Sequence, residues 1–201
     1  MQQEMKENLA VIRIAMKLKA SFTDCFHLLK GNHENITNED SGGNHSFRKF
    51  VQEGQMCCDF IRQVYGDVIL HLLSIWEKSL PLCAVFDSFG ASHAEPLEAF
   101  SRSRVINCRS NPQVVHGLTW TQNDEVMDST CSRFLAELNP CAKPCGILWF
   151  GGHRPVKDSI FALRQEGQYL QLHNPSQMNA AYVVHGKKFN PKKDFIILGD
   201  K

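Results

Sequence analysis

The chain has 201 residues, of which 43% are hydrophobic and 21% charged, and its formal net charge is +1. This composition excludes a disordered chain and suits one globular domain with a substantial core. The small net charge gives no electrostatic reason to expect a nucleic acid or a membrane surface as partner. The longest apolar runs fall far short of the roughly 20 residues of a membrane span. The first twenty residues have no uninterrupted apolar core and do not resemble a signal peptide, so we expect a cytoplasmic protein that binds neither.

The N-terminal half is predicted to be mostly helical. Residues 5–22 carry apolar side chains at helical spacing and predict an amphipathic helix of about five turns. "CFHLL", residues 25–29, indicates a short buried strand, and the polar stretch that follows it is typical of a loop. Residues 46–80 predict further helices with a break at Gly66-Asp67.

The C-terminal half alternates short strands with loops. "LCAVFDSF", residues 82–89, predicts a strand, and residues 96–102 a short helix. Residues 103–145 are loop-rich, with one helix expected near 129–138, and "CGILWFGG" predicts a strand ending in two glycines. The remaining short, alternating segments indicate antiparallel hairpins. With no internal repeat and no long linker, we expect a single α/β domain covering residues 1–201.

Three of the apolar segments end in polar loops that contain a histidine. The first runs into Asn32-His33-Glu34, the second into His93 and the third into His153. In α/β sheets, ligands bind beyond the carboxyl ends of the strands, and imidazole and amide oxygen are good ligands for transition metals. A single histidine after a strand is more often a loop residue without a role, so the prediction depends on convergence of the three segments.

The eight cysteines follow no repeating C-x-x-C pattern, which favours reduced thiols in a cytoplasmic protein. A structural zinc site at Cys141 and Cys145 is an open alternative. It would need two more ligands, such as Cys131 and a histidine.

The block "LLKGNHE" resembles the G-N-H-[ED] motif of the calcineurin-like metallophosphoesterases, in particular their phosphoprotein (serine/threonine) phosphatase branch. Lys30 stands where that branch usually has arginine. "YGDVILHLLSIWEKSLPLCAVF", "GASHAEP", "LTWTQND" and "WFGGHRPV" are similar to later landmarks of the family in the same order. Ala94-Glu95 departs from the two glycines that follow the family's histidine. The resemblance implies a sandwich of mixed β-sheets flanked by helices.

The resemblance also implies a two-metal hydrolase. Asn32, His93 and His153 would bind one of two divalent ions, which are Mn, Fe or Zn in the family. His33 would be the general acid for the leaving oxygen, and Glu34 would support its neighbours. The substrate would be a phosphorylated protein or a small phosphoester, hydrolysed by metal-activated water.

Two N-terminal blocks of the family, D-x-H and G-D-x-x-[DN]-R-G, are not found in the sequence. We therefore expect a metallophosphoesterase-like domain that is incomplete at its N-terminus and lacks the first strands. Two alternatives stay open on function. One is a nucleotide polyphosphatase, and the other is a degenerate, non-catalytic protein that acts as a binding module.

Overall fold

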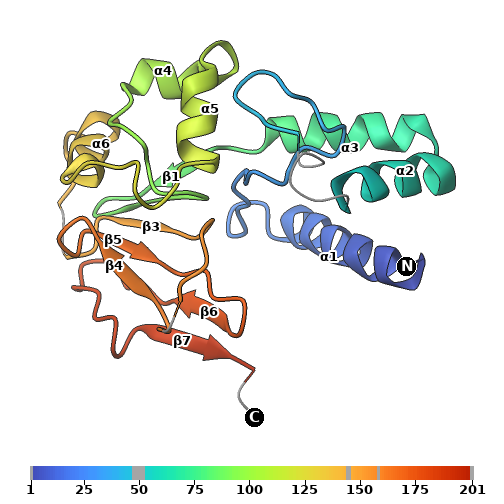
Figure 1. The fold of residues 1–201 in the computed structure, drawn as a ribbon. Helices are drawn as coiled ribbons and strands as arrows, with labels where there is room; N and C mark the ends of the chain where they lie inside the picture. The colour runs from blue at the N-terminus through green and yellow to red at the C-terminus, as the bar shows by residue number, and fades with distance from the viewer. Residues whose placement is uncertain (1, 47–52, 144–145, 158, 200–201) are drawn as a thin grey trace. The chain divides into compact units, whose positions relative to one another are not determined.

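The computed structural model describes residues 2–46, 53–143, 146–157 and 159–199 (Figure 1). The chain divides into two compact units. Unit 1 comprises residues 1–29, 33–39 and 45–81, and unit 2 comprises residues 30–32, 40–44 and 82–201. That both units belong to one domain stays a prediction.

Unit 1 is helical. Its helices are α1 (Gln2–Ser21), α2 (Glu53–Tyr65) and α3 (Asp67–Ser79). Cys58, Ile61 and Leu70 form the buried centre of this unit. Gly66 separates α2 from α3 with φ +85°, a conformation that glycine adopts without steric cost. Helices and the break at Gly66 are found where they were predicted, but residues 47–52 of the segment expected to be helical lie outside the described residues.

The strand expected at residues 25–29 is absent from the structure. α1 ends in a turn in which the amides of Cys25 and Phe26 donate to Phe22 O, and residues 26–31 then form irregular chain. An apolar run becomes a strand only where another strand pairs with it, and none does here among the residues that the structure describes.

Unit 2 contains a five-stranded mixed sheet in the order β1-β2-β3-β5-β4. Its strands are β1 (Cys83–Val85), β2 (Gly90–Ser92), β3 (Trp149–Gly151), β4 (Ala162–Arg164) and β5 (Tyr169–Gln171). The pairs β2–β3 and β3–β5 are parallel, whereas β1–β2 and β4–β5 are antiparallel. The predicted strand at 82–89 is thus the first arm of a hairpin, and its second arm leads to His93.

Helices cover one face of this sheet, and a second, two-stranded sheet covers the other (Figure 1). The helices are α4 (Arg102–Ile106), a 3₁₀ turn (Cys108–Ser110), α5 (Pro112–Thr119) and α6 (Thr130–Leu138). The second sheet pairs β6 (Met178–Ala181) with β7 (Phe195–Leu198) in antiparallel register. The prediction of an α/β fold and of C-terminal hairpins is confirmed.

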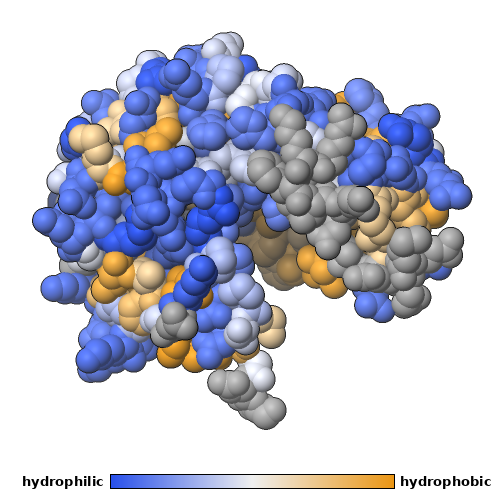
Figure 2. Space-filling view, in the orientation of Figure 1, coloured by the Kyte–Doolittle hydropathy of each residue, from blue (hydrophilic) through white to orange (hydrophobic). Residues whose placement is uncertain are grey.

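Alternation along the strands explains the two cores of unit 2. Trp149 and Tyr169 point to the helices and pack with residues such as Leu118 and Phe134. Phe150 and Leu170 point to the other face and pack with Phe189. Over the C-terminal strands, apolar side chains also reach the surface (Figure 2), among them Leu163, Ile196 and Leu198.

Two expectations for residues 96–145 were wrong. The helix expected at 96–102 begins only at Arg102, because the amide of Leu97 bonds instead to Gly117 O at the end of α5. The stretch 103–145 holds α4 and α5 in addition to the predicted α6. The start of α5 has a recognisable signal, since Pro112 occupies its first turn.

No helix in the described part of the chain is long and apolar enough to cross a membrane.

Candidate functional site

Two of the predicted histidines lie at the same edge of the five-stranded sheet. His93 directly follows β2, and His153 comes two residues after β3. Because β2 and β3 are parallel, their carboxyl ends meet at one edge. The amide of Gly152 donates to His93 O at 2.9 Å, which joins the two loops directly.

The side chains of Asn32, His93 and His153 converge there. His93 Nε2 lies 2.8 Å from Asn32 Oδ1 and 3.1 Å from His153 Nδ1. The two imidazole rings are 5.0 Å apart at their centroids and inclined at 58°. Asn32 is 7% exposed, and all three residues belong to unit 2. The structure therefore brings together the three residues that the sequence singles out as ligands of one ion, from positions about sixty residues apart.

Buried hydrogen bonds fix the backbone on both sides of His93. The Trp149 Nε1–H group donates to Ser92 Oγ at 2.8 Å, and Ser92 Oγ donates to Ala94 O at 2.5 Å. The amide of Ala94 donates to Leu118 O at 2.9 Å. These bonds hold the His93 loop between β2 and the end of α5. No sequence pattern indicated the part that Ser92 and Trp149 play in this.

His153 adopts an unusual backbone conformation, with φ +47°. Few residues other than glycine adopt the left-handed region, and such conformations gather at functional sites. The His153 ring lies in a T-shaped arrangement with Trp120, with ring centroids 6.2 Å apart and planes inclined at 72°. Trp120 lies at the end of α5 and comes from the "LTWTQND" segment.

The first glycine of the pair before His153 makes room for a tyrosine. A Cβ atom on Gly151 would collide with the hydroxyl group of Tyr169 and would lie 3.0 Å from Ser92 O. Tyr169 is 1% exposed, and its pKa is raised by burial and secondarily by the charge of Glu95. The phenol is therefore neutral at physiological pH, and it occupies the space that the glycine leaves open.

Glu95 is a further polar residue at this edge, and the sequence analysis assigned it no role. It is 4% exposed and accepts hydrogen bonds from Arg164 Nε and Gln165 Nε2, both at 2.7 Å. Its partners lie 69 and 70 residues away in the sequence, so no local pattern points to this role. A buried acid of this kind needs a partner.

The other two predicted site residues, His33 and Glu34, follow Asn32 directly but belong to unit 1. Within that unit His33 is exposed and Glu34 is half-buried. The amide of Asn35 donates to His33 O at 2.7 Å, which forms a tight turn. The roles of His33 as general acid and of Glu34 as supporting carboxylate stay predictions.

Among the residues that the structure describes, no group of three or more His, Cys, Asp or Glu side chains is placed to hold a metal ion. The donor set at the sheet edge is of a different kind, because it combines two imidazoles with an amide.

The alternative of a structural zinc site at Cys141 and Cys145 gains no support. Cys131 is 0% exposed inside the apolar core, Cys141 is a free thiol, and Cys145 lies outside the described residues. The seven described cysteines form no disulfide with one another.

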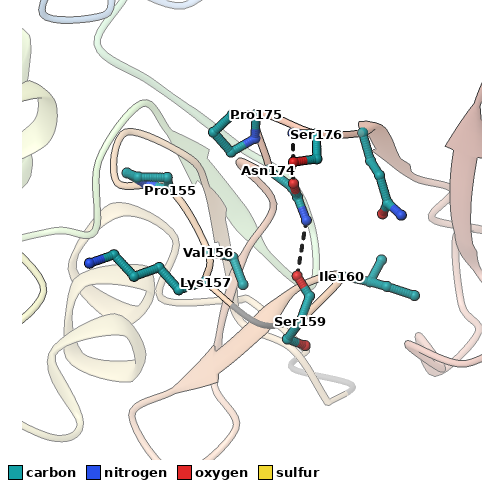
Figure 3. Close-up of a pocket in the computed structure, with 9 residues that line it drawn as sticks. Pro155, Val156, Lys157, Ser159, Ile160, Asn174, Pro175 and Ser176 are labelled. Carbon is teal, nitrogen blue, oxygen red and sulfur yellow. Dashed lines mark hydrogen bonds between the residues drawn. The ribbon is translucent and has the colours of Figure 1, made fainter.

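Two cavities border the loops near His153. One of about 560 Å³ is lined by residues 155–157, 159–160 and 174–177 (Figure 3), where Asn174 Nδ2 donates to Ser159 O at 3.0 Å. Its described lining residues include no His, Cys, Asp or Glu, and Lys157 is the one ionisable side chain among them. The other, of about 390 Å³, is lined by Ser92, Gly151 and Gly152 among others. It leaves room for a bound molecule beside the site.

No protein-family model matches the chain, and no curated protein matches it in sequence. A solved structure of a protein serine/threonine phosphatase from Saccharomyces cerevisiae, described as similar to human phosphatase PP5, has the same fold with a TM-score of 0.63. The two sequences are 17% identical, and the match covers 94% of this chain and 64% of that one. The chain thus has a phosphatase-like fold and spans less than two thirds of the length of this neighbour.

Proposed function

We propose that the chain carries one metal-binding half of a phosphoesterase site of the serine/threonine phosphatase kind. The observation that supports this most strongly is the convergence of Asn32, His93 and His153 at the carboxyl end of β2 and β3. The phosphatase-like fold and the order of the sequence motifs point in the same direction.

The three side chains fit a divalent ion. Neighbouring ligands of an octahedral ion with bonds of about 2.1 Å lie about 3 Å apart, and the observed separations are 2.8 and 3.1 Å. Two imidazole nitrogens and one amide oxygen suit Mn, Fe or Zn. All three donors are neutral. A second ion close to the first would require carboxylates, and the part of the chain that the structure describes holds no such cluster.

Each residue would have a separate task. Asn32, His93 and His153 would hold the ion, and Ser92 and Trp149 would keep the His93 loop in place. A bound divalent ion supplies a Lewis acid that acidifies a water molecule. His33 would donate a proton to the leaving oxygen of a phosphorylated protein or a small phosphoester, because imidazole can carry that proton near neutral pH.

Titration with Co²⁺ tests the metal site, with binding followed by calorimetry and by visible absorption. We expect one site in the unsubstituted chain. His93→Ala and His153→Ala should each lower its affinity at least tenfold, since each removes one of three protein ligands. His185→Ala is the matched control, because His185 is exposed in the same unit and its only described ion pair is with Asp87 at 3.7 Å. Equal affinities in all four proteins would contradict the proposal.

Hydrolysis of p-nitrophenyl phosphate with added Mn²⁺ tests how complete the site is. We expect turnover at or near background, because three neutral ligands do not offset the charge of two adjacent ions. Robust metal-dependent turnover that His33→Ala abolishes would show instead that the 201 residues form a complete catalytic site.

A non-catalytic, phosphatase-like binding module is the second candidate. It is favoured by the lack of a carboxylate-containing metal cluster among the described residues and by Glu95, which replaces a family glycine and bonds to Arg164. This function predicts no Co²⁺ site that depends on His93. The Co²⁺ titration therefore separates the two candidates.

A further inference from the structure

We propose that Glu95 is a positioning residue that fixes the His93 loop against the β4–β5 hairpin and so sets the separation of His93 and His153. The proposal rests on the proposed metal site and adds a residue to it. Glu95 is not a ligand in this role, since both of its carboxylate oxygens are already engaged by other side chains.

The contacts of Glu95 reach a distant part of the chain. Its Oε2 accepts from Arg164 Nε and its Oε1 from Gln165 Nε2, each at 2.7 Å, over 69 and 70 residues of sequence. Gln165 continues the network, because its Oε1 accepts from the amide of Cys131 in the first turn of α6 at 2.8 Å. The carboxylate thus joins the His93 loop to a hairpin and to a helix.

The network is shielded from water. The side chain of Glu95 is 3% exposed and that of Arg164 is 26% exposed, and Gln165 as a whole is 7% exposed. Removing one member would leave the other buried charge without its partner, which costs far more than loss of a surface pair. The Glu95–Arg164 pair is therefore able to hold a loop, unlike an exposed pair.

The turn that carries Arg164 and Gln165 is conformationally demanding. Gln165 and Glu166 have φ +49° and +54°, and both are non-glycine residues in the left-handed region. Residues in such conformations persist where surrounding contacts hold them. The bonds of Gln165 to Glu95 and Cys131 are contacts of this kind.

The sheet register connects this turn to the second histidine. Arg164 pairs with Tyr169 in β5, and Tyr169 pairs with Trp149 in β3. β3 leads into the His153 loop, and Glu95 lies two residues after His93. The side-chain bonds of Glu95 and the pairing of β4, β5 and β3, together with the short stretches of chain at both ends, therefore link one predicted ligand to the other.

Glu95→Gln, compared with Glu98→Gln, tests the proposal in the full 201-residue chain. The control breaks an ion pair of equal length, Arg104 Nη1 to Glu98 Oε1 at 2.7 Å, three residues further along. That pair is 36% and 52% exposed and does not reach the hairpin. We expect Glu95→Gln to weaken Co²⁺ binding about tenfold and to alter the Co²⁺ visible spectrum at saturation. Glu98→Gln should change affinity less than about twofold.

Hydrogen exchange without metal provides an independent measurement. We expect Glu95→Gln, but not Glu98→Gln, to speed exchange of the amides of Ala94 and Gly152, which bond to Leu118 O and His93 O. If Glu95→Gln does not fold, Arg164→Lys replaces it, because lysine keeps the charge but lacks the Nε group. Arg164→Lys should then change the Co²⁺ affinity, the visible spectrum and the amide exchange in the same direction as Glu95→Gln, but by smaller amounts.

The outcomes separate the two proposals. Lack of a Co²⁺ site in the unsubstituted chain would contradict the proposed function, whereas the exchange rates would still report on the positioning role. Unchanged affinity, spectrum and exchange in a folded Glu95→Gln protein would overturn the positioning role, even where the protein melts at a lower temperature. Such a result would leave Glu95 a residue that contributes only to stability.

Discussion

Two adjacent glycines in the loop of residues 40–44 differ in what surrounds them. Gly42 and Gly43 have φ +62° and +83°, so both adopt a conformation that L-residues disfavour. A Cβ atom on Gly42 would meet nothing within 4 Å. A Cβ atom on Gly43 would collide with Pro112 O and lie 2.8 Å from Val115 Cβ. Gly43 thus allows this loop to approach the first turns of α5.

We expect Gly43→Ala to destabilise the protein by about 2–5 kcal/mol, as the sum of backbone strain and overpacking. Gly42→Ala should cost only about 1–2 kcal/mol, because strain alone applies. Equilibrium denaturation in urea measures the loss of unfolding free energy in both variants. Equal losses in the two variants would show that the approach to α5 does not contribute to stability.

The thiol of Cys83 makes the stability of the protein sensitive to alkaline pH. Burial, and secondarily the neighbouring Cys108, raises the pKa of Cys83 from the ordinary 9.0 to about 12. Above pH 9 the unfolded chain loses this proton while the folded chain keeps it. The stabilising contribution is therefore complete below pH 9 and is lost as the pH rises towards 12.

We expect Cys83→Ala to reduce the fall in unfolding free energy between pH 9 and 11, where each differentially bound proton contributes up to about 1.4 kcal/mol per pH unit. Cys25→Ala is the control, since Cys25 is exposed. Denaturation at several pH values measures the slopes. Identical slopes in the two variants would contradict a raised pKa for Cys83.

At the scale of elements, β2 and β3 are joined by a side-chain hydrogen bond as well as by their backbones. Trp149 is 0% exposed, and its indole N–H group donates to Ser92 Oγ. Ser92→Ala would leave this buried donor without an acceptor. The cost of such a group is about 1–3 kcal/mol.

We therefore expect Ser92→Ala to lose about 1–3 kcal/mol of stability and to shift the tryptophan emission of the folded protein. Ser103→Ala removes the same hydroxyl from an exposed position in α4 and should be nearly neutral. Denaturation followed by fluorescence compares them. If the two variants are equally stable, the indole N–H group has another acceptor.

The sequence predicted elements well where the signal is local. The break at Gly66 between α2 and α3 and the hairpin of β4 and β5 depend on neighbouring residues, and both are found. Residues 25–29 had the composition of a strand but not the partner, which only tertiary structure supplies. α1 carries apolar residues on an exposed side too, as Val11 and Ile14 are 66% and 57% exposed. Apolar side chains at helical spacing therefore predicted this helix but not which of them are buried.

At the scale of the molecule, the predicted site depended on residues far apart in sequence. Asn32, His93 and His153 each follow an apolar segment, and the resemblance to the phosphatase family implied that they are ligands. The parallel pairing of β2 and β3 brings two of them together. Glu95 could not be assigned, since its partners lie 69 and 70 residues away and no local pattern indicates them. Sequence patterns thus identified the candidate ligands but not the contacts that hold them.

The ligand geometry also makes a prediction about the stability of unit 2 as a whole. Asn32, His93 and His153 come from three separate segments of this unit, so an ion that binds them binds the folded chain and not the unfolded one. At a free Co²⁺ concentration one hundred times its dissociation constant, the gain in stability is about 2.7 kcal/mol. For a chain of this length, that gain corresponds to a rise in melting temperature of about 5–11 °C.

We expect Co²⁺ to raise the melting temperature of the unsubstituted protein and of His185→Ala, but not that of His93→Ala. EDTA should reverse the rise. Hydrogen exchange should locate the effect, with slower exchange at Ala94 and Gly152 and little change in α2 and α3, which contribute no ligand. The melting temperature by calorimetry and the amide hydrogen exchange are measured on the same samples. If Co²⁺ raised the melting temperature of His93→Ala as much as that of the unsubstituted protein, the ion would be binding elsewhere, for example at exposed thiols such as Cys25 and Cys141. The three converging side chains would then be a hydrogen-bonded cluster that holds loop 30–32 to the sheet edge and not a metal site.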